Sequence, residues 1–259
     1  MNILPIRTPL LHAQDTVAAI LAAHASFEDN DIVVVSSKVL ATAEGRVMNL
    51  EAQKPSERAR TLAPTCGQDP HFTELVLRET ERMHGTIVGT CPFALLTSLR
   101  PTGMQTGRIL CPNAGLDQSN VAKGFVVGWP ENPLKATMDL QASLEKKSKR
   151  HLAVILTDSC CRPARAGVVA FALVCVGIDP IRNEAGKKDL FGKPLRFTQE
   201  AIADQLATAA NAVMGNAGQS IPAAIIRDHG LALSNFSGWV NGIDPKEDLF
   251  REAFMNGKW

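Results

Sequence analysis

The sequence lacks the cysteine spacing that a structural zinc site needs. None of its six cysteines forms a C-x-x-C pair, and structural zinc sites are typically built from such pairs. Cys160 and Cys161 are adjacent, which is a poor arrangement for a structural disulfide. We therefore interpret the cysteines as ordinary reduced thiols, as is usual for a cytoplasmic protein.

An excess of charge of either sign is also missing. The formal net charge is +1 at pH 7, which gives no electrostatic reason to expect binding to nucleic acid or to an anionic membrane. No apolar run approaches the ~20 residues of a membrane span. The first residues lack the basic and apolar regions of a secretory signal peptide. We expect a soluble, cytoplasmic protein that binds any phosphate through a local site.

Four well-known motifs of catalysis and nucleotide binding are missing as well. The chain contains no G-x-x-x-x-G-K-[ST], no G-x-G-x-x-G after a strand, no G-x-S-x-G and no H-E-x-x-H. Their absence excludes the P-loop, the dinucleotide fingerprint, the hydrolase nucleophile turn and the zinc-protease helix. A catalytic site in this chain has to be built from less common segments.

The sequence does contain a mixture of strand and helix patterns. Short apolar runs bounded by turn residues predict buried strands at 32–35, 152–156, 168–176 and 221–226, with two or three more within 86–111. Apolar residues at helical spacing predict helices at 15–25, 57–63, from Asp69-Pro70 onward, at 134–149 and at 199–214. Asp15 is placed to cap the first helix.

These patterns predict a mixed α/β fold. No repeat, low-complexity tract or linker divides the chain. We therefore expect one domain over residues 1–259, with two interlocked lobes as the alternative.

Two glycine-containing segments are more polar than a core element requires. Ser36-Ser37-Lys38 follows a buried strand, and Glu44-Gly45-Arg46 comes shortly after it. Lys38 and Arg46 in this region could bind an anion, although a solvated loop is the favoured interpretation. The segment 214–219 reads Met-Gly-Asn-Ala-Gly-Gln. A helix C-cap explains its first glycine, and the remainder suits a loop that contacts a nucleotide.

Two further segments carry carboxylates. The segment 113–120 reads Asn-Ala-Gly-Leu-Asp-Gln-Ser-Asn and offers the oxygen ligands that Mg²⁺ or Mn²⁺ prefers. An Asx-rich turn is the alternative. Asp158 ends a predicted buried strand, and Arg162 and Arg165 follow it. Ligands gather at such strand ends, so Asp158 is a candidate metal ligand and the arginines candidate anion donors, with a structural Asp–Arg pair as the alternative. Together these segments suit phosphoryl chemistry.

The order and spacing of these segments resemble a known family. VVVSSKVLATAEGR, CPNAGLDQSNV, WPENP, VILTDSCCRPARAG and KKDLFGKPL are similar to the gamma-glutamyl ligases that extend the deazaflavin coenzyme F420, and to relatives assigned to folate. The resemblance covers nearly the whole chain, and NAGLDQSN and TDS…R…R…G are its most specific parts. It implies a gamma-glutamyl ligase-like α/β fold with mixed sheets in an intertwined homodimer.

The resemblance also implies ligands and roles for individual residues. It implies GTP or ATP as a co-substrate and two divalent ions, Mg²⁺ or Mn²⁺. The implied metal ligands are Asp117, Asp158, Ser159 and Asn216. The implied nucleotide contacts are Pro9, Leu10, Ser37, Lys38, Asn120, Met214, Gly215 and Gly218. The implied catalytic residues are Asp158, Arg162 and Arg165.

The chemistry implied by the resemblance has two steps. A carboxylate of the acceptor attacks the γ-phosphate and forms an acyl phosphate. The amine of L-glutamate then displaces phosphate and forms an amide. Small molecules, namely L-glutamate, a nucleotide and the acceptor, are therefore the expected partners, besides a second copy of the chain.

Four positions depart from the family pattern. Thr42 stands where the family usually has Lys, and Asn216 stands where it usually has Glu. Cys161 replaces a Gly, and Ala164 replaces a bulky aromatic residue. These changes favour an altered substrate or nucleotide over a dead site. We expect a ligase that acts on a folate or related cofactor, with the deazaflavin precursor or a non-catalytic nucleotide-binding homologue as the alternatives.

Overall fold

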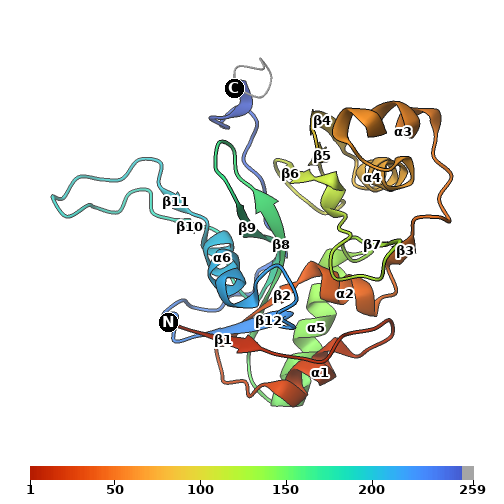
Figure 1. Ribbon diagram of the computed structural model, residues 1–259. Coiled ribbons are helices and arrows are strands. Elements are labelled where there is room, and N and C mark those ends of the chain that lie inside the picture. The colour runs from red at the N-terminus through yellow and green to blue at the C-terminus, as the bar shows by residue number, and fades with distance from the viewer. Residues whose placement is uncertain (253–259) are drawn as a thin grey trace.

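A six-stranded mixed sheet forms the centre of the protein (Figure 1). The computed structural model describes residues 1–252, and residues 253–259 of the predicted domain lie outside the described residues. The strand order is β1-β12-β2-β8-β9-β13. β2 and β8 are parallel, and the other neighbours are antiparallel. The strands are β1 (Asn2–Ile6), β2 (Ile32–Ser36), β8 (Ala153–Cys161), β9 (Val168–Val176), β12 (Ala223–Arg227) and β13 (Ser237–Trp239). The predicted mixed α/β class is confirmed.

The central strands are apolar because both faces of the sheet are covered. Val33 and Val35 on β2 belong to a core cluster shared with α1 (Val17–His24) and α5 (Pro133–Ser148). Ile32 and Val34 belong to a second cluster shared with α6 (Ile202–Met214). Because strand side chains alternate between faces, a continuous apolar run is the pattern of a strand buried on both sides.

The helix boundaries follow the capping residues, with two differences from the prediction. Asn132 caps α5 by accepting a hydrogen bond from the Lys135 amide. Thr16, not Asp15, stands at the N-cap of α1. The Asp15 carboxylate instead accepts from the His12 amide and closes the preceding turn. Helix α6 begins at Ile202, later than predicted, because 199–200 pairs as a strand.

A smaller lobe lies beside the main sheet (Figure 1). It combines a three-stranded antiparallel sheet with α3 and α4. Ser56 caps α3, and Asp69 caps α4 as predicted. Its elements are α3 (Glu57–Leu62), η1 (Ala63–Cys66), α4 (Pro70–Arg82), β4 (Thr86–Cys91), β5 (Ala94–Leu99) and β6 (Ile109–Pro112). Between this lobe and the main sheet lie α2 (Ser37–Ala43), the paired strands β3 (Val47–Asn49) and β7 (Phe125–Val127), and η2 (Asn113–Gly115).

A long hairpin projects away from the rest of the chain (Figure 1). It is held by a short pairing of β10 (Arg182–Asn183) with β11 (Gln199–Glu200). Its side chains Leu190, Phe191 and Phe197 are almost fully exposed. The predicted intertwined homodimer stays a prediction, because only one chain is present.

Two expectations about the whole chain can be compared with the structure. The six cysteines form no disulfide, as predicted. In the part of the chain that the structure describes, no helix is long and apolar enough to cross a membrane. The cytoplasmic location stays a prediction.

A buried ion pair fastens the end of β12 to the turn before β2. The Arg227 guanidinium donates to both carboxylate oxygens of Asp31, at 2.8 and 2.7 Å, and to Glu28 and the Ser26 carbonyl. The Asp31 side chain is 1% exposed. A buried carboxylate that loses its partner is strongly destabilising.

We expect Arg227→Met to lower the free energy of unfolding by about 3 kcal/mol, because Asp31 would stay buried without its cation. Urea unfolding followed by circular dichroism measures the change. Arg150→Met is the matched control, since the Arg150–Asp29 pair is about half exposed on both sides, and exposed ion pairs contribute little to stability. Equal losses in the two variants would contradict the role assigned to Asp31.

Candidate functional site

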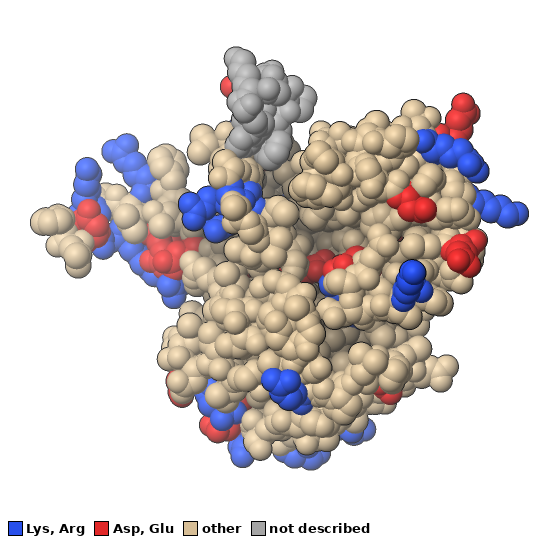
Figure 2. Space-filling model, viewed as in Figure 1, with Lys and Arg blue, Asp and Glu red and all other residues tan. Residues whose placement is uncertain are grey.

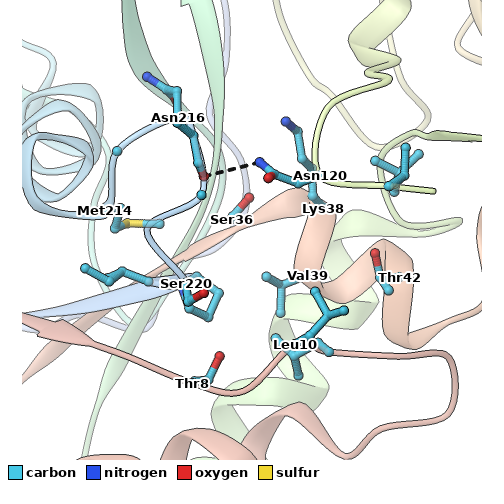
Figure 3. Close-up of a pocket in the computed structure, with 18 of the residues that line it drawn as sticks. Thr8, Leu10, Ser36, Lys38, Val39, Thr42, Asn120, Met214, Asn216 and Ser220 are labelled. Atoms are coloured by element: carbon cyan, nitrogen blue, oxygen red, sulfur yellow. Dashed lines mark hydrogen bonds between the residues drawn. The ribbon is translucent and has the colours of Figure 1, made fainter. Parts of the chain in front are cut away.

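A cavity of about 550 Å³ opens beside the ends of β2 and β12 and the middle of β8. Most of its lining comes from residues 8–13, the start of α2, residues 120–122, residues 157–159 of β8 and the loop 214–222 after α6. Figure 3 shows Leu10, Val39 and Thr42 on one side and Met214 and Asn216 on the other. Figure 2 shows acidic atoms in a hollow next to the small lobe. The cavity therefore combines apolar side chains with polar loops.

Helix α2 places a lysine at the cavity. The segment 36–38 was favoured as a solvated loop, which is wrong: the chain enters α2 at Ser37 directly after β2. Lys38 lines the cavity and is the only Lys or Arg among the described residues that do so. Its ammonium group donates to the Asp117 carboxylate and to the Ser119 hydroxyl. Arg46 is engaged elsewhere, because it pairs with Glu79 and Glu131.

Asp117 is held by the donors around it. Its carboxylate accepts from Lys38 and from the Ser119 amide and hydroxyl. Burial opposes its ionisation, but the hydrogen bond and charge of Lys38 outweigh burial and hold the pKa of Asp117 below its ordinary value. Asp117 is therefore ionised at neutral pH. It lines a smaller neighbouring hollow of about 380 Å³ and reaches the main cavity through its bond to Lys38.

The sequence predicted a strand at 152–156 that ends before Asp158. In the structure β8 continues to Cys161, so Asp158 lies within the strand. The β8–β9 register shifts between Leu156 and Thr157, and such bulges redirect the side chains that follow them. The Asp158 carboxylate accepts from the Trp129 indole N–H at 2.5 Å and from the Ser159 amide at 2.8 Å. Burial raises the pKa of Asp158 to about 6, against the lowering effect of these two donors.

The loop after α6 closes one side of the cavity. Gly215 ends the helix with φ of 70°, as predicted for a C-cap glycine. A Cβ on Gly215 would lie 2.6 Å from the Gln219 side chain, so glycine permits the tight turn. Gln219 accepts from the Ala217 amide. Asn120 donates to the Ala217 carbonyl at 3.4 Å across the cavity (Figure 3).

The structure brings most of the predicted site residues together. Those that line the cavity are Pro9, Leu10, Lys38, Asn120, Asp158, Ser159, Met214, Gly215, Asn216 and Gly218. Ser37 does not line it, because its side chain is fully buried with an unpaired hydroxyl; Ser36 lines it instead. Arg162 and Arg165 lie in the exposed turn between β8 and β9 and do not line the cavity. Their catalytic role stays a prediction.

The positions that depart from the family pattern lie in two places. Thr42 and Asn216 line the cavity, so each change acts on the site itself. Cys161 and Ala164 are exposed at the far end of β8 and in the turn after it.

Burial raises the pKa of Cys160 to about 11, so its thiolate is scarce at neutral pH. An ordinary thiol is what the sequence suggested for Cys160.

No chemical pattern in the sequence singles out Trp129, which lies in the segment WPENP. It is buried in the loop after β7, and it reaches Asp158 only through the fold. Thr8 and Val39 were also missed as cavity residues. No local pattern marks them, because an apolar or small polar residue looks the same in a core and in a binding site.

The donors near Asp158 fit a hard divalent cation. The charge of Asp117 is close enough to disfavour the ionisation of Asp158, and a divalent ion would offset the charges of both carboxylates. Ser159 and Asn216 add a hydroxyl and an amide oxygen, joined by a 2.8 Å hydrogen bond. No group of three or more His, Cys, Asp or Glu suited to a metal occurs in residues 1–252, so neutral oxygens would have to complete the ligand set.

Comparison with known proteins identifies the family. The family model for F420-0:Gamma-glutamyl ligase matches residues 5–228. The chain is 38% identical over 221 residues to the coenzyme F420:L-glutamate ligase of Methanosarcina mazei, covering 85% of this chain and 83% of that protein. It is 35% identical to the ligase of the same name from Methanopyrus kandleri, over 92% of each chain. The corresponding ligase of Methanothermobacter thermautotrophicus is 33% identical, over 94% of this chain and 95% of its own length. The chain therefore belongs to the F420-0:gamma-glutamyl ligase family.

Proposed function

We propose that this protein uses a nucleoside triphosphate to join L-glutamate to a carboxylate of the deazaflavin coenzyme precursor F420-0. The family assignment and the names of the curated relatives support this acceptor. They support it better than the folate acceptor that the sequence favoured, for which these comparisons offer nothing. The observation that carries the proposal is that Lys38 and Asp158 line one cavity of about 550 Å³, and that Lys38 is bonded to Asp117 in the neighbouring hollow.

The proposed reaction first activates the acceptor. A carboxylate oxygen of the acceptor attacks the γ-phosphorus, the bond to the β-phosphate oxygen breaks, and a nucleoside diphosphate leaves. The L-glutamate amine then attacks the acyl carbon, the C–O bond to phosphate breaks, and an amide forms with loss of a proton. Both steps spread negative charge over phosphate oxygens, so positioning and charge neutralisation provide most of the catalysis.

The residues divide between binding and charge neutralisation. Leu10, Val39 and Val127 provide apolar surface in the cavity, which suits the flat base of a nucleotide. Lys38 supplies the positive charge for the phosphates. We propose GTP as the nucleotide, with ATP as the alternative, and the loop 214–218 as its wall.

Asp117, Asp158, Ser159 and Asn216 are the residues that would hold divalent metal. Bound there, Mg²⁺ or Mn²⁺ would neutralise phosphate oxygens. Asn216 provides an amide oxygen where a carboxylate would bind more strongly, so we expect weaker metal binding at that end of the site.

The proposal is tested by incubating the protein with GTP or ATP, Mg²⁺ or Mn²⁺, L-glutamate and either F420-0 or a reduced folate. Mass spectrometry should show F420-0 heavier by one glutamyl residue and no change in the folate. Asp158→Asn, which keeps the side-chain shape and removes the charge, should lower the rate by at least about 100-fold. Glutamylation of the folate alone would contradict the proposed acceptor.

The same assay separates a ligase from a non-catalytic homologue. Thr42 and Asn216 motivate that alternative, because each removes a charge from the site. Nucleotide binding without phosphate release or product, with either acceptor, would favour it. Formation of product excludes it.

We expect Lys38→Met to lower kcat by about 100-fold or more, because no other Lys or Arg lines the described part of the cavity. Lys135→Met is the control, since Lys135 pairs with Asp139 on the exposed face of α5. Steady-state phosphate release measures both variants. A Lys38→Met enzyme with the control's rate would place the phosphates elsewhere.

We also propose that the protein is a homodimer held partly by the hairpin at 181–200. Leu190, Phe191 and Phe197 are 101%, 94% and 90% exposed in the single chain. Apolar side chains grouped in this way on a projecting arm are typical of a protein interface. A second copy of the chain is the partner implied by the family resemblance.

Replacing both Leu190 and Phe191 by Ser should convert a dimer into a monomer, because the arm would lose its apolar contact with the other copy. Size-exclusion chromatography with light scattering measures the mass in solution. Met138→Ser, which changes an exposed apolar residue of α5, should leave the dimer intact. A wild-type monomer, or a double variant that stays dimeric, would contradict the proposal.

A further inference from the structure

A glycine makes room for a tryptophan beside the Asp158 carboxylate. Gly115 has φ of +74°, and a Cβ placed on it would lie 2.5 Å from the Nε1 and Cε2 atoms of Trp129. Real Cβ atoms do not approach other atoms so closely, so any larger residue would displace the indole. The backbone of η2 therefore fixes one face of the ring.

A second tryptophan contacts the same ring. The Trp239 and Trp129 ring centroids are 6.4 Å apart with planes tilted by 51°, which is a favourable aromatic arrangement. The indole N–H of Trp239 donates to the Thr102 carbonyl and not to Asp158. Trp129 is 1% exposed, so its position is set by packing on both faces.

The indole N–H of Trp129 donates a hydrogen bond to Asp158. Indole is a donor only, and here it donates to Oδ2 of Asp158 at 2.5 Å, while the Ser159 amide donates to Oδ1 at 2.8 Å. Each carboxylate oxygen therefore accepts a hydrogen bond from a different donor. Rotation of the carboxylate would break one or both of these bonds.

We propose that Trp129 is a positioning residue that orients the Asp158 carboxylate for binding a divalent cation, and that Gly115 is glycine to allow this. The inference rests on the proposed function, because it assigns Asp158 a ligand. A hydrogen-bonded partner behind a metal ligand typically changes metal affinity by 10- to 100-fold. A purely structural tryptophan would change stability without changing that affinity.

The test uses three variants of the full chain and Mn²⁺ as the probe. Trp129→Phe keeps a ring in place but removes the donor, and it should weaken Mn²⁺ binding about 10-fold in titrations followed by electron paramagnetic resonance. In the ligase assay the Mn²⁺ concentration for half-maximal rate should rise, whereas the KM for L-glutamate should not. Gly115→Ala should weaken Mn²⁺ binding as well, because it pushes the indole away from Asp158.

Trp239→Phe is the matched control. It alters the neighbouring ring without removing a donor to Asp158, so it should lower Tm and leave Mn²⁺ affinity unchanged. Wild-type Mn²⁺ affinity in Trp129→Phe would overturn the inference, as would equal losses of affinity in Trp129→Phe and Trp239→Phe.

The outcomes also separate this inference from the proposed function. A wild-type protein that binds Mn²⁺ but forms no glutamylated product would overturn the proposed function. The Mn²⁺ affinities of the variants would still test the role of Trp129. A wild-type protein that binds no Mn²⁺ would overturn the metal site and, with it, the role of Trp129.

Discussion

The parallel pairing of β2 with β8 is the constraint on which the site depends. Its register places Ser36, the last residue of β2, opposite Thr157. Helix α2 therefore starts beside the strand segment that carries Asp158, and Lys38 is the second residue of this helix. Residues more than a hundred positions apart in the chain are brought to one cavity by a single strand pair. The remaining strands of the sheet are antiparallel to their neighbours.

Around this pair, the fold adds layers that fix the charged groups. The segment after η2, between the small lobe and the main sheet, supplies Asp117, and Lys38 connects this residue to α2. The bulge in the β8–β9 pairing, where Leu173 of β9 has no partner in the register, and the buried Trp129 set the position of Asp158. The two carboxylates differ in environment: Lys38 lowers the pKa of Asp117, whereas burial raises that of Asp158. Such a contrast is common where a site is arranged for catalysis or ion binding.

The departures from the family pattern act on this arrangement unevenly. Thr42 and Asn216 line the cavity. Relative to the family pattern, Thr42 removes a positive charge and Asn216 removes a negative one. Lys38 is the only Lys or Arg among the described residues that line the cavity. Cys161 and Ala164 are on the exposed side of the β8–β9 connection. The family assignment and the retained carboxylates support ligase chemistry, and the comparisons support the proposed deazaflavin acceptor better than the folate that the sequence favoured.

The sequence by itself determined the fold class, most elements and the family. Apolar runs marked the buried strands, and Asp69 lies at a real helix start as predicted, because local hydrogen bonding decides such starts. Most predicted nucleotide contacts do line one cavity. Only the tertiary structure decided that Ser36 and not Ser37 faces that cavity, that Arg162 and Arg165 lie outside it, and that Trp129 holds Asp158. These facts depend on strand register and on packing between distant segments, which no local sequence pattern specifies.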